Sequence, residues 1–325
     1  MIAFGPLPSR RLGRSLGINH IPPPKACTYS CVYCQVGRTT WMPVERSVFY
    51  EPTEVERAVR EHVARVGEAG ETVDFLSFVP NGEPTLDVNL GREIAQLRSL
   101  GKIAVITNGS LLWREDVRAG LMPADWVSLK VDAVREPVWR RVNRPHRALR
   151  LASIMDGMRR FAQEYRGKLA TDTMLVAGIN DDAGHLEEIA EFLACLQPAV
   201  AYLAVPIRPP AERWVRLPDE ATINRAFQVF SSRLDLVELL TGYEGNAYAF
   251  TGDVAANLLS ITAVQPMRQD AVGAFLTRAG ADWAVVRRLI AQGELVETEY
   301  AGHKFYVKAL PASVNGDGQG KTKEL

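Results

Sequence analysis

The 325-residue sequence predicts an α/β protein built on a mostly parallel sheet, with a smaller unit at its C-terminal end. Three observations lead to this fold class. Short apolar runs alternate with amphipathic helical segments between about residues 53 and 240, which is the pattern of repeated βα units. Six or seven such units are present, fewer than a closed (β/α)8 barrel needs. After about residue 250, three helical segments precede two runs of alternating polarity.

The expected strands are short, apolar and bounded by turn residues. They lie at 15–21, 73–79, 102–107, 126–131, 169–176, 200–205 and 236–240. The expected helices carry apolar residues at helical spacing. They lie at 53–66, 88–100, 111–120, within 148–166, and at about 183–196 and 219–233. We expect the first helix to begin at Thr53, because Thr53-x-x-Glu56 has the form of a capping box.

The composition excludes several classes of partner and location. The 38 Lys and Arg residues balance 38 Asp and Glu residues, so net charge gives no signal for nucleic acid or for a membrane surface. No apolar run approaches the ~20 residues of a spanning helix, and the N-terminus has no secretory apolar core. Three of the four cysteines are clustered, which suits a reducing compartment. We therefore predict a cytoplasmic protein with no membrane contact.

The cysteines Cys27, Cys31 and Cys34 have the spacing C-x3-C-x2-C, on a loop that follows Ile21-Pro22-Pro23-Pro24. Soft thiolates select iron–sulfur clusters, zinc or copper(I). Three cysteines on a four-iron cluster would leave one iron with an open position. The alternative is a structural zinc site, with His20 or Cys195 as the fourth ligand. Zinc loops usually combine two C-x2-C pairs, however, and the sequence has no second pair.

The cysteine loop resembles that of the radical S-adenosylmethionine (SAM) superfamily. The resemblance implies a [4Fe-4S] cluster on the three cysteines, with SAM chelated at the open iron and cleaved reductively to a 5′-deoxyadenosyl radical. It implies a partial (β/α)6 TIM-like barrel over residues 1–245. It also implies an enzyme whose radical abstracts hydrogen from an unidentified substrate, and a low-potential reductant such as flavodoxin or ferredoxin as a partner. The reaction class, whether oxidoreductase, lyase or transferase, is left open.

Motifs that resemble those of the superfamily follow the predicted strands, where barrels place their chemistry. Asn81-Gly82-Glu83-Pro84 is similar to the Gly-Gly-Glu-Pro motif that holds the SAM amino group, with Asn81 in place of the first glycine. An ordinary Asn-Gly turn is the alternative interpretation of this stretch. The residues for which the resemblance implies SAM contacts are Tyr33, Asn81, Gly82, Glu83, Thr107, Asn108, Ser128 and Ile179.

Lys130 is the candidate catalytic residue, at the end of the strand that resembles the superfamily's Ser-x-Asp-Ala strand. Its amine could hold the SAM carboxylate, or form a Schiff base if burial lowers its pKa. An ion pair with Asp132 is an equally compatible structural role.

The C-terminal unit, residues 250–310, resembles a winged helix-turn-helix domain. Three helices are expected at 253–264, 268–278 and from 281, followed by a hairpin of 295–300 and 304–308. Six Lys and Arg residues face six Asp and Glu residues in this unit, so it lacks the positive charge of a DNA reader. We favour protein docking over DNA, and a role with RNA stays open. Residues 311–325 are predicted to be a disordered tail.

Two other functions remain as alternatives. Pro8-Ser9-Arg10-Arg11-Leu12-Gly13 resembles a branch grouped with tRNA wyosine-base synthetases, which implies tRNA-base modification. Those enzymes use a second cluster, for which Cys195 alone is too little. The other alternative is a regulator that senses the cluster or SAM and binds nucleic acid through the winged helix.

Overall fold

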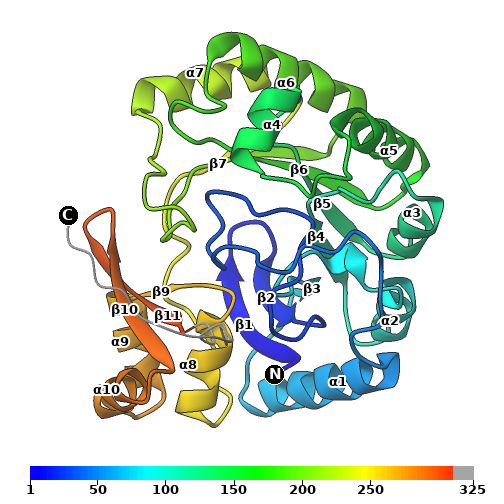
Figure 1. Ribbon diagram of the computed structural model, residues 1–325. Coiled ribbons are helices and arrows are strands. Elements are labelled where there is room, and N and C mark those ends of the chain that lie inside the picture. The colour runs from blue at the N-terminus through cyan, green and yellow to red at the C-terminus, as the bar shows by residue number, and fades with distance from the viewer. Residues whose placement is uncertain (310–325) are drawn as a thin grey trace, which may run out of the picture.

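The computed structural model describes residues 1–309, and its central feature is one curled sheet of eight strands in the order β1 to β8 (Figure 1). The strands β1 (Ala3–Ser9) and β2 (Gly13–Ile18) form an antiparallel hairpin, and each later strand pairs in parallel with the one before it. The later strands are β3 (Phe75–Phe78), β4 (Ile103–Thr107), β5 (Trp126–Lys130), β6 (Lys168–Met174), β7 (Val200–Ala204) and β8 (Val237–Leu240). The sheet is open, which confirms the predicted partial barrel.

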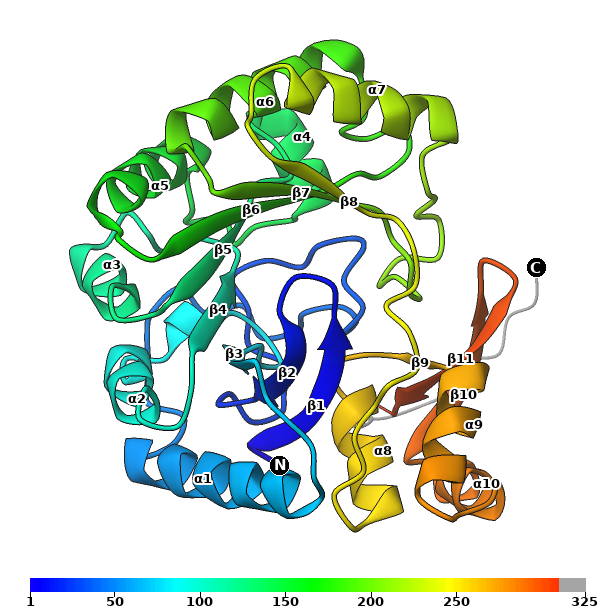
Figure 2. The ribbon, with the colours of Figure 1, turned by 180° about the vertical axis from the view of Figure 1, so that it is seen from behind.

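Helices form a continuous layer on the outer face of the sheet (Figure 2). They are α1 (Pro52–Glu68), α2 (Leu90–Leu97), α3 (Glu115–Leu121), α5 (Leu151–Glu164), α6 (Ala183–Leu196) and α7 (Glu220–Ser231). A short helix α4 (Glu136–Val142) and a 3-10 turn η1 (Pro84–Leu86) lie in the loops that follow strands. Apolar residues of these helices, such as Val55, Ile94 and Leu193, are fully buried against the sheet.

Three local features differ from the sequence-based expectation. The strand β1 was not predicted because Gly5, Pro6 and Pro8 read as a turn, but β1 is the edge strand, where proline costs no ladder hydrogen bond. The first predicted strand, 15–21, is instead β2 at Gly13–Ile18. The capping box at Thr53 does not form. Helix α1 begins at Pro52, whose fixed φ starts the helix, and its N-cap has no side-chain hydrogen bond.

The alternation of strand residues sorts the sheet into two faces. Leu76, Val105 and Val127 face the helices and belong to the main core. The alternate residues of these strands face the inside of the half-barrel, where a separate apolar cluster contains Trp126 and Tyr202. Polar side chains on the strands, such as Ser128 and Lys130, therefore reach the interior from these inward positions.

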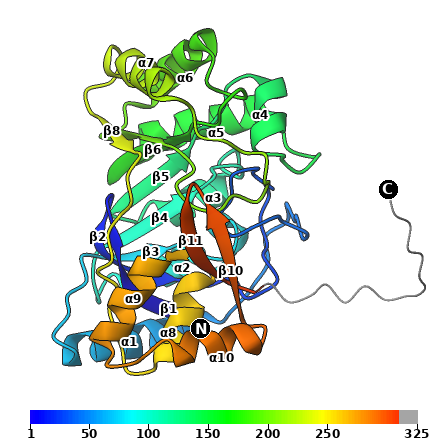
Figure 3. The same ribbon diagram turned by 90° about the vertical axis from the view of Figure 1, so that its left-hand side faces the viewer.

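A second core belongs to the C-terminal unit, which packs beside the β1–β2 hairpin (Figure 3). Its elements are α8 (Val254–Thr262), β9 (Met267–Arg268), α9 (Gln269–Arg278), α10 (Ala284–Ala291), β10 (Leu295–Tyr300) and β11 (His303–Lys308). The three strands form a sheet in the order β10-β11-β9. Phe4 and Leu7 of β1 are buried in the same core, so the hairpin joins the two parts of the chain.

The assignment of this unit to the winged-helix class stays a prediction, as do the domain limits at 245 and 250. The predicted tail, 311–325, lies outside the described residues. Within residues 1–309, no helix has the length and apolar character needed to cross a membrane.

Candidate functional site

Two loops meet at the open mouth of the half-barrel, one carrying the cysteines and one following β3. They pair through Ala26, whose N–H donates to the Asn81 carbonyl (3.1 Å) and whose carbonyl accepts from the Glu83 N–H (3.0 Å). Gly82 lies between these bonds with φ +149°, and a Cβ there would lie 1.6 Å from the Ala26 carbonyl oxygen. Only glycine allows this approach, so Gly82 fixes the position of the cysteine loop against the strand-end loop.

The three cysteines lie together on the loop after β2, partly exposed, and each sulfur accepts a hydrogen bond from a different side chain. These contacts are Lys25 Nζ to Cys34 Sγ (3.1 Å), Asn143 Nδ2 to Cys31 Sγ (3.4 Å) and Asn108 Nδ2 to Cys27 Sγ (3.6 Å). N–H donors to thiolate sulfur are among the groups that tune an iron–sulfur cluster. Sequence reasoning did not identify Lys25 and Asn143 as partners of the sulfurs.

The donor set fits a cluster better than a single zinc ion. A structural zinc site usually needs a fourth protein ligand beside three thiolates. The two alternative fourth ligands are elsewhere, because Cys195 is exposed on α6 and His20 is buried beneath Pro84.

Burial strongly affects the protonation of the thiols. It raises the pKa of Cys27 far above the usual range and the pKa of Cys31 to about 12. These thiols therefore need a bound metal to lose their protons. Burial also disfavours the charge on Lys25, but Cys34 and Cys27 outweigh it and raise the pKa of the amine. A cationic Lys25 beside the sulfurs is compatible with a negatively charged thiolate–metal centre.

Glu83 organises the strand-end loops. Its buried carboxylate accepts from the Thr85 N–H (3.0 Å), the Thr85 hydroxyl (2.6 Å) and the Thr107 hydroxyl through Oε1. Its Oε2 accepts from the Asn108 N–H (2.8 Å). Burial raises the pKa of Glu83, and these four donors oppose that shift. Because Oε2 has only one of these donors, it retains acceptor capacity for an ammonium group.

The structure brings most of the other predicted SAM residues to the same mouth. Asn81 is buried and its side-chain oxygen has no hydrogen-bond partner among residues 1–309. Ser128 faces the interior from β5, and its hydroxyl likewise lacks a partner in the described chain. Ile179 is buried in the loop after β6, which Asn180 holds through hydrogen bonds to the Asp132 and Met174 carbonyls.

A charged group lies deeper in the half-barrel. Lys130 Nζ is 2.6 Å from Asp172 Oδ1 and 3.6 Å from Asp132 Oδ1, and it lies 5.1 Å from the centre of the Tyr33 ring. The Tyr33 hydroxyl donates to Asp132, and Arg11 pairs with Asp172. Asp172 was not predicted from the sequence. Its signal would have been a carboxylate on the same face of β6 as the apolar Ala170 and Met174, which both belong to the inward-facing cluster.

The electrostatics of this group bear on the two roles expected for Lys130. Burial disfavours its charge, but Asp132 and Asp172 outweigh burial and raise its pKa. The ion pair with Asp132 is present at 3.6 Å, and the raised pKa favours this charged role, while the Schiff-base role stays a prediction. Burial also opposes the ionisation of Asp172, yet Arg11 and Lys130 lower its pKa.

A cavity of about 330 Å³ connects these residues to the C-terminal unit. Its lining includes Tyr33 and Gly82 from the two loops, Lys130 from β5, and Val264 and Gln265 from the segment after α8. Gln35 Nε2 donates to the Val264 carbonyl (2.8 Å), which ties the cysteine loop to the C-terminal unit.

Comparison with known proteins agrees with this geometry. The sequence model of the Radical SAM superfamily matches residues 21–193. A UPF0026 protein of Methanocaldococcus jannaschii is 43% identical over 312 residues, covering 95% of this chain and 96% of the relative. A UPF0026 protein of Helicobacter pylori is 32% identical over 226 residues, covering 69% of this chain and 72% of the relative.

Among solved structures, TYW1 with a lysine-pyruvate adduct bound superposes with a TM-score of 0.52 at 18% identity, covering 68% of this chain and 74% of that chain. This likeness concerns the fold. Proteins of the matching family are enzymes that use a [4Fe-4S] cluster and SAM, and they typically need a reductant. The chain belongs to the radical SAM superfamily, within the UPF0026 group.

Proposed function

We propose that this enzyme binds SAM between the cysteine loop and the Glu83 loop, and abstracts hydrogen from a substrate held in the adjoining cavity. The observation that carries the proposal is the cavity itself, which extends from Tyr33 and Gly82 to Lys130 and the C-terminal unit. Its volume of about 330 Å³ lies at the lower end of the range of small-molecule sites.

The residues of the chain divide the work of binding. Cys27, Cys31 and Cys34 would hold the cluster, which together with bound SAM supplies a 5′-deoxyadenosyl radical. Glu83 Oε2 and the carbonyls of its loop offer acceptors for the SAM amino group. For the other SAM contacts we keep the predicted residues, namely Tyr33, Asn81, Gly82, Thr107, Asn108, Ser128 and Ile179.

The charges that line the cavity indicate what it accepts. Three cations, Arg11, Lys130 and Arg208, and two carboxylates, Asp172 and Glu244, line the cavity, and Asp132 behind Lys130 balances the third cation. The guanidinium and ammonium groups offer charged donors to an anionic group, either the carboxylate of SAM or an acidic group on the substrate. Lys130 would act here as a charged hydrogen-bond donor held by its carboxylate partners, in place of a covalent nucleophile.

The C-terminal unit would serve to exclude water from the cavity. Gln35 bonds to Val264, and the Tyr300 hydroxyl donates to the Pro206 carbonyl (2.8 Å), so the unit is tied to the barrel on both sides of the opening. Exclusion of water prevents side reactions of a radical. We further propose flavodoxin or ferredoxin as the reductant, an RNA or a protein as the substrate class, and a cytoplasmic location.

The test is formation of 5′-deoxyadenosine after anaerobic cluster reconstitution, with SAM and a strong reductant. We expect product from the wild-type protein and from Cys195→Ala, which removes a cysteine outside the loop. We expect none from Cys27→Ala. A folded, iron-loaded wild-type protein that forms no 5′-deoxyadenosine under these conditions would overturn the proposal.

A further inference from the structure

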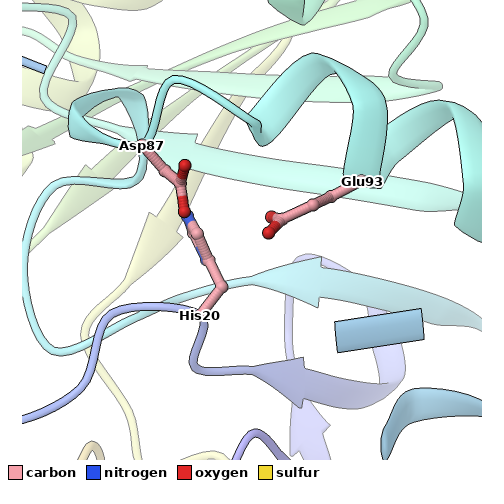
Figure 4. A group of neighbouring side chains, drawn as sticks. All are labelled: His20, Asp87 and Glu93. Carbon is pink, nitrogen blue, oxygen red and sulfur yellow. The ribbon is translucent and has the colours of Figure 1, made fainter. Parts of the chain in front are cut away.

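Three buried side chains with metal-ligating atoms converge behind the Glu83 loop (Figure 4). His20 lies two residues after β2, Asp87 directly follows η1, and Glu93 lies on α2. All three are 0% exposed, and their ligand atoms lie within 4.8 Å of one another. The convergence therefore comes from three separate elements and not from one acidic run.

The atoms that face one another are all acceptors without donors. His20 Nδ1, Asp87 Oδ2 and both carboxylate oxygens of Glu93 have no hydrogen-bond partner anywhere in residues 1–309. A buried carboxylate without a partner is strongly destabilising unless it is paired, protonated or coordinated to a metal ion. Arg46 is the nearby cation, and its charge favours the ionised form of Asp87. Its guanidinium, however, donates to the Thr85 and Asp87 carbonyls and pairs with Asp116.

The surrounding hydrogen bonds orient these atoms toward a common point. His20 Nε2 lies 3.3 Å from the Pro84 carbonyl and donates to it, which leaves Nδ1 as the lone-pair atom. The Asn89 N–H donates to Asp87 Oδ1 (2.8 Å), which leaves Oδ2 turned to the group. A histidine that donates its second N–H to a carbonyl is the usual outer arrangement of a metal-ligating imidazole.

We propose that His20, Asp87 and Glu93 bind one divalent metal ion of the zinc or manganese type, at a site that shares no ligand with the cysteine loop. Two carboxylates and a neutral imidazole carry a charge that a divalent ion cancels. Imidazole with carboxylates suits zinc and manganese, whereas calcium and magnesium prefer oxygen alone and copper(I) prefers sulfur. Ligand bonds of about 2.0–2.2 Å at a tetrahedral centre place the ligand atoms about 3.4 Å apart, so atoms that lie within 4.8 Å of one another would move together when the ion binds.

A proton is the competing occupant of this space. Burial raises the pKa of Glu93 to about 9 and lowers the pKa of His20 to about 4. In the metal-free protein Glu93 would therefore be neutral and His20 would be uncharged. The two occupants differ in a measurable way, because only one of them gives a stoichiometric metal content.

The metal ion would support the loop that carries Glu83, and this inference goes beyond the proposed function. Asp87 follows the Glu83-Pro84 turn at once, and His20 holds the Pro84 carbonyl. A metal ion would link this turn to β2 and to α2. We expect it to hold Glu83 in place without contacting SAM.

The experiment measures metal binding without SAM, so its result is independent of radical chemistry. The full-length chain with Cys27, Cys31 and Cys34 all changed to Ser is titrated with Zn²⁺ followed by mass-spectrometric metal analysis, and with Mn²⁺ followed by electron paramagnetic resonance. We expect about one equivalent of either metal per chain, with a higher Tm when metal is present.

Glu93→Gln in this background copies the neutral carboxyl group and should fold, but it should bind metal at least about tenfold more weakly. His185→Gln is the matched control, because His185 is also fully buried and its ring nitrogens lack partners in the described residues. We expect this control to keep the metal. Failure of the folded triple-Ser chain to bind either ion, or equal binding by Glu93→Gln, would overturn the proposal and assign the group to a shared proton.

Discussion

The substitution Gly82→Ala tests how the two loops of the site are held together. Gly82 has φ +149°, and a Cβ there would lie 1.6 Å from the Ala26 carbonyl oxygen and 2.6 Å from its carbonyl carbon. An ordinary contact begins at 3.4 Å, so the loops would have to separate by about 1.8 Å. That separation removes both backbone hydrogen bonds of Ala26, to the Asn81 carbonyl and from the Glu83 N–H.

The expected cost follows from these losses. Each backbone bond is worth about 0.5–1.5 kcal/mol, and a side chain in this φ region adds about 1–3 kcal/mol. The free energy of unfolding should therefore fall by about 2–6 kcal/mol, a large part of the stability of a typical protein. Displacement of Glu83 by more than 1 Å should also slow SAM cleavage by about 100-fold or more.

The assays are urea unfolding of the cluster-free protein and 5′-deoxyadenosine formation by the reconstituted protein. Gly70→Ala is the matched control, because Gly70 also has positive φ (+72°) but its Cβ would meet nothing within 4 Å. We expect this control to lose about 1 kcal/mol and to keep full activity. If Gly82→Ala is no less stable than Gly70→Ala and equally active, the role assigned to this close approach is wrong.

Three further predictions concern the charged residues of the mouth. Glu83→Gln would turn an amide N–H toward the Thr107 hydroxyl or the Asn108 N–H. The free energy of unfolding should fall by about 1–3 kcal/mol, and SAM should bind more weakly in a calorimetric titration. An unchanged stability and an unchanged SAM affinity would refute the acceptor role. The stabilisation from Asp172, whose pKa is lowered, is present above about pH 4 and is lost as the pH falls through its folded-state pKa. Near neutral pH the free energy of unfolding of Asp172→Asn should therefore be about 3–5 kcal/mol below that of the wild type, and this difference should shrink as the pH falls. If urea unfolding shows that the two free energies change in parallel with pH, the ion pair is contradicted. The carboxylate partners raise the pKa of Lys130, so we expect no Schiff base there. Treatment with pyruvate and borohydride should leave Lys130 unlabelled in a mass-spectrometric peptide map. A covalent adduct on Lys130 would show that its carboxylate partners do not keep it protonated.

The sequence predicted the larger elements well because their signals are local. Helix α6 was expected at 183–196 and lies at Ala183–Leu196, where the Asp182 side chain caps the start and Gln197 ends the helix in a left-handed conformation. The order of the parallel strands follows from the βα alternation, and the strand-end position of Asn81-Gly82-Glu83-Pro84 follows from that order. These features need no knowledge of tertiary contacts.

The features that the sequence did not predict depend on tertiary structure. The strand β1 contains two prolines, and only its place at the edge of the sheet allows them. Helix α4 has seven residues and four charged or proline positions in its sequence Glu-Pro-Val-Trp-Arg-Arg-Val, so its apolar pattern is too short to detect. Asp172 shows its role only once the inward face of β6 is known.

The group of His20, Asp87 and Glu93 illustrates the same limit. The residues lie on a loop, after a 3-10 turn and on a helix. The second residue comes 67 positions after the first, so no local spacing joins them. By contrast, the three cysteines lie within eight residues and were predicted as ligands from spacing alone. Their role in cluster binding stays a prediction for this chain.

The most direct test of the central claim is electron–nuclear double resonance of the reduced, reconstituted protein with SAM labelled by ¹⁷O in its carboxylate. Three cysteine ligands leave one iron open, so we predict a hyperfine coupling from the labelled carboxylate to the cluster. The Cys195→Ala protein should give the same coupling. Saturating SAM binding, measured by equilibrium dialysis, without any ¹⁷O coupling would contradict the three-cysteine site.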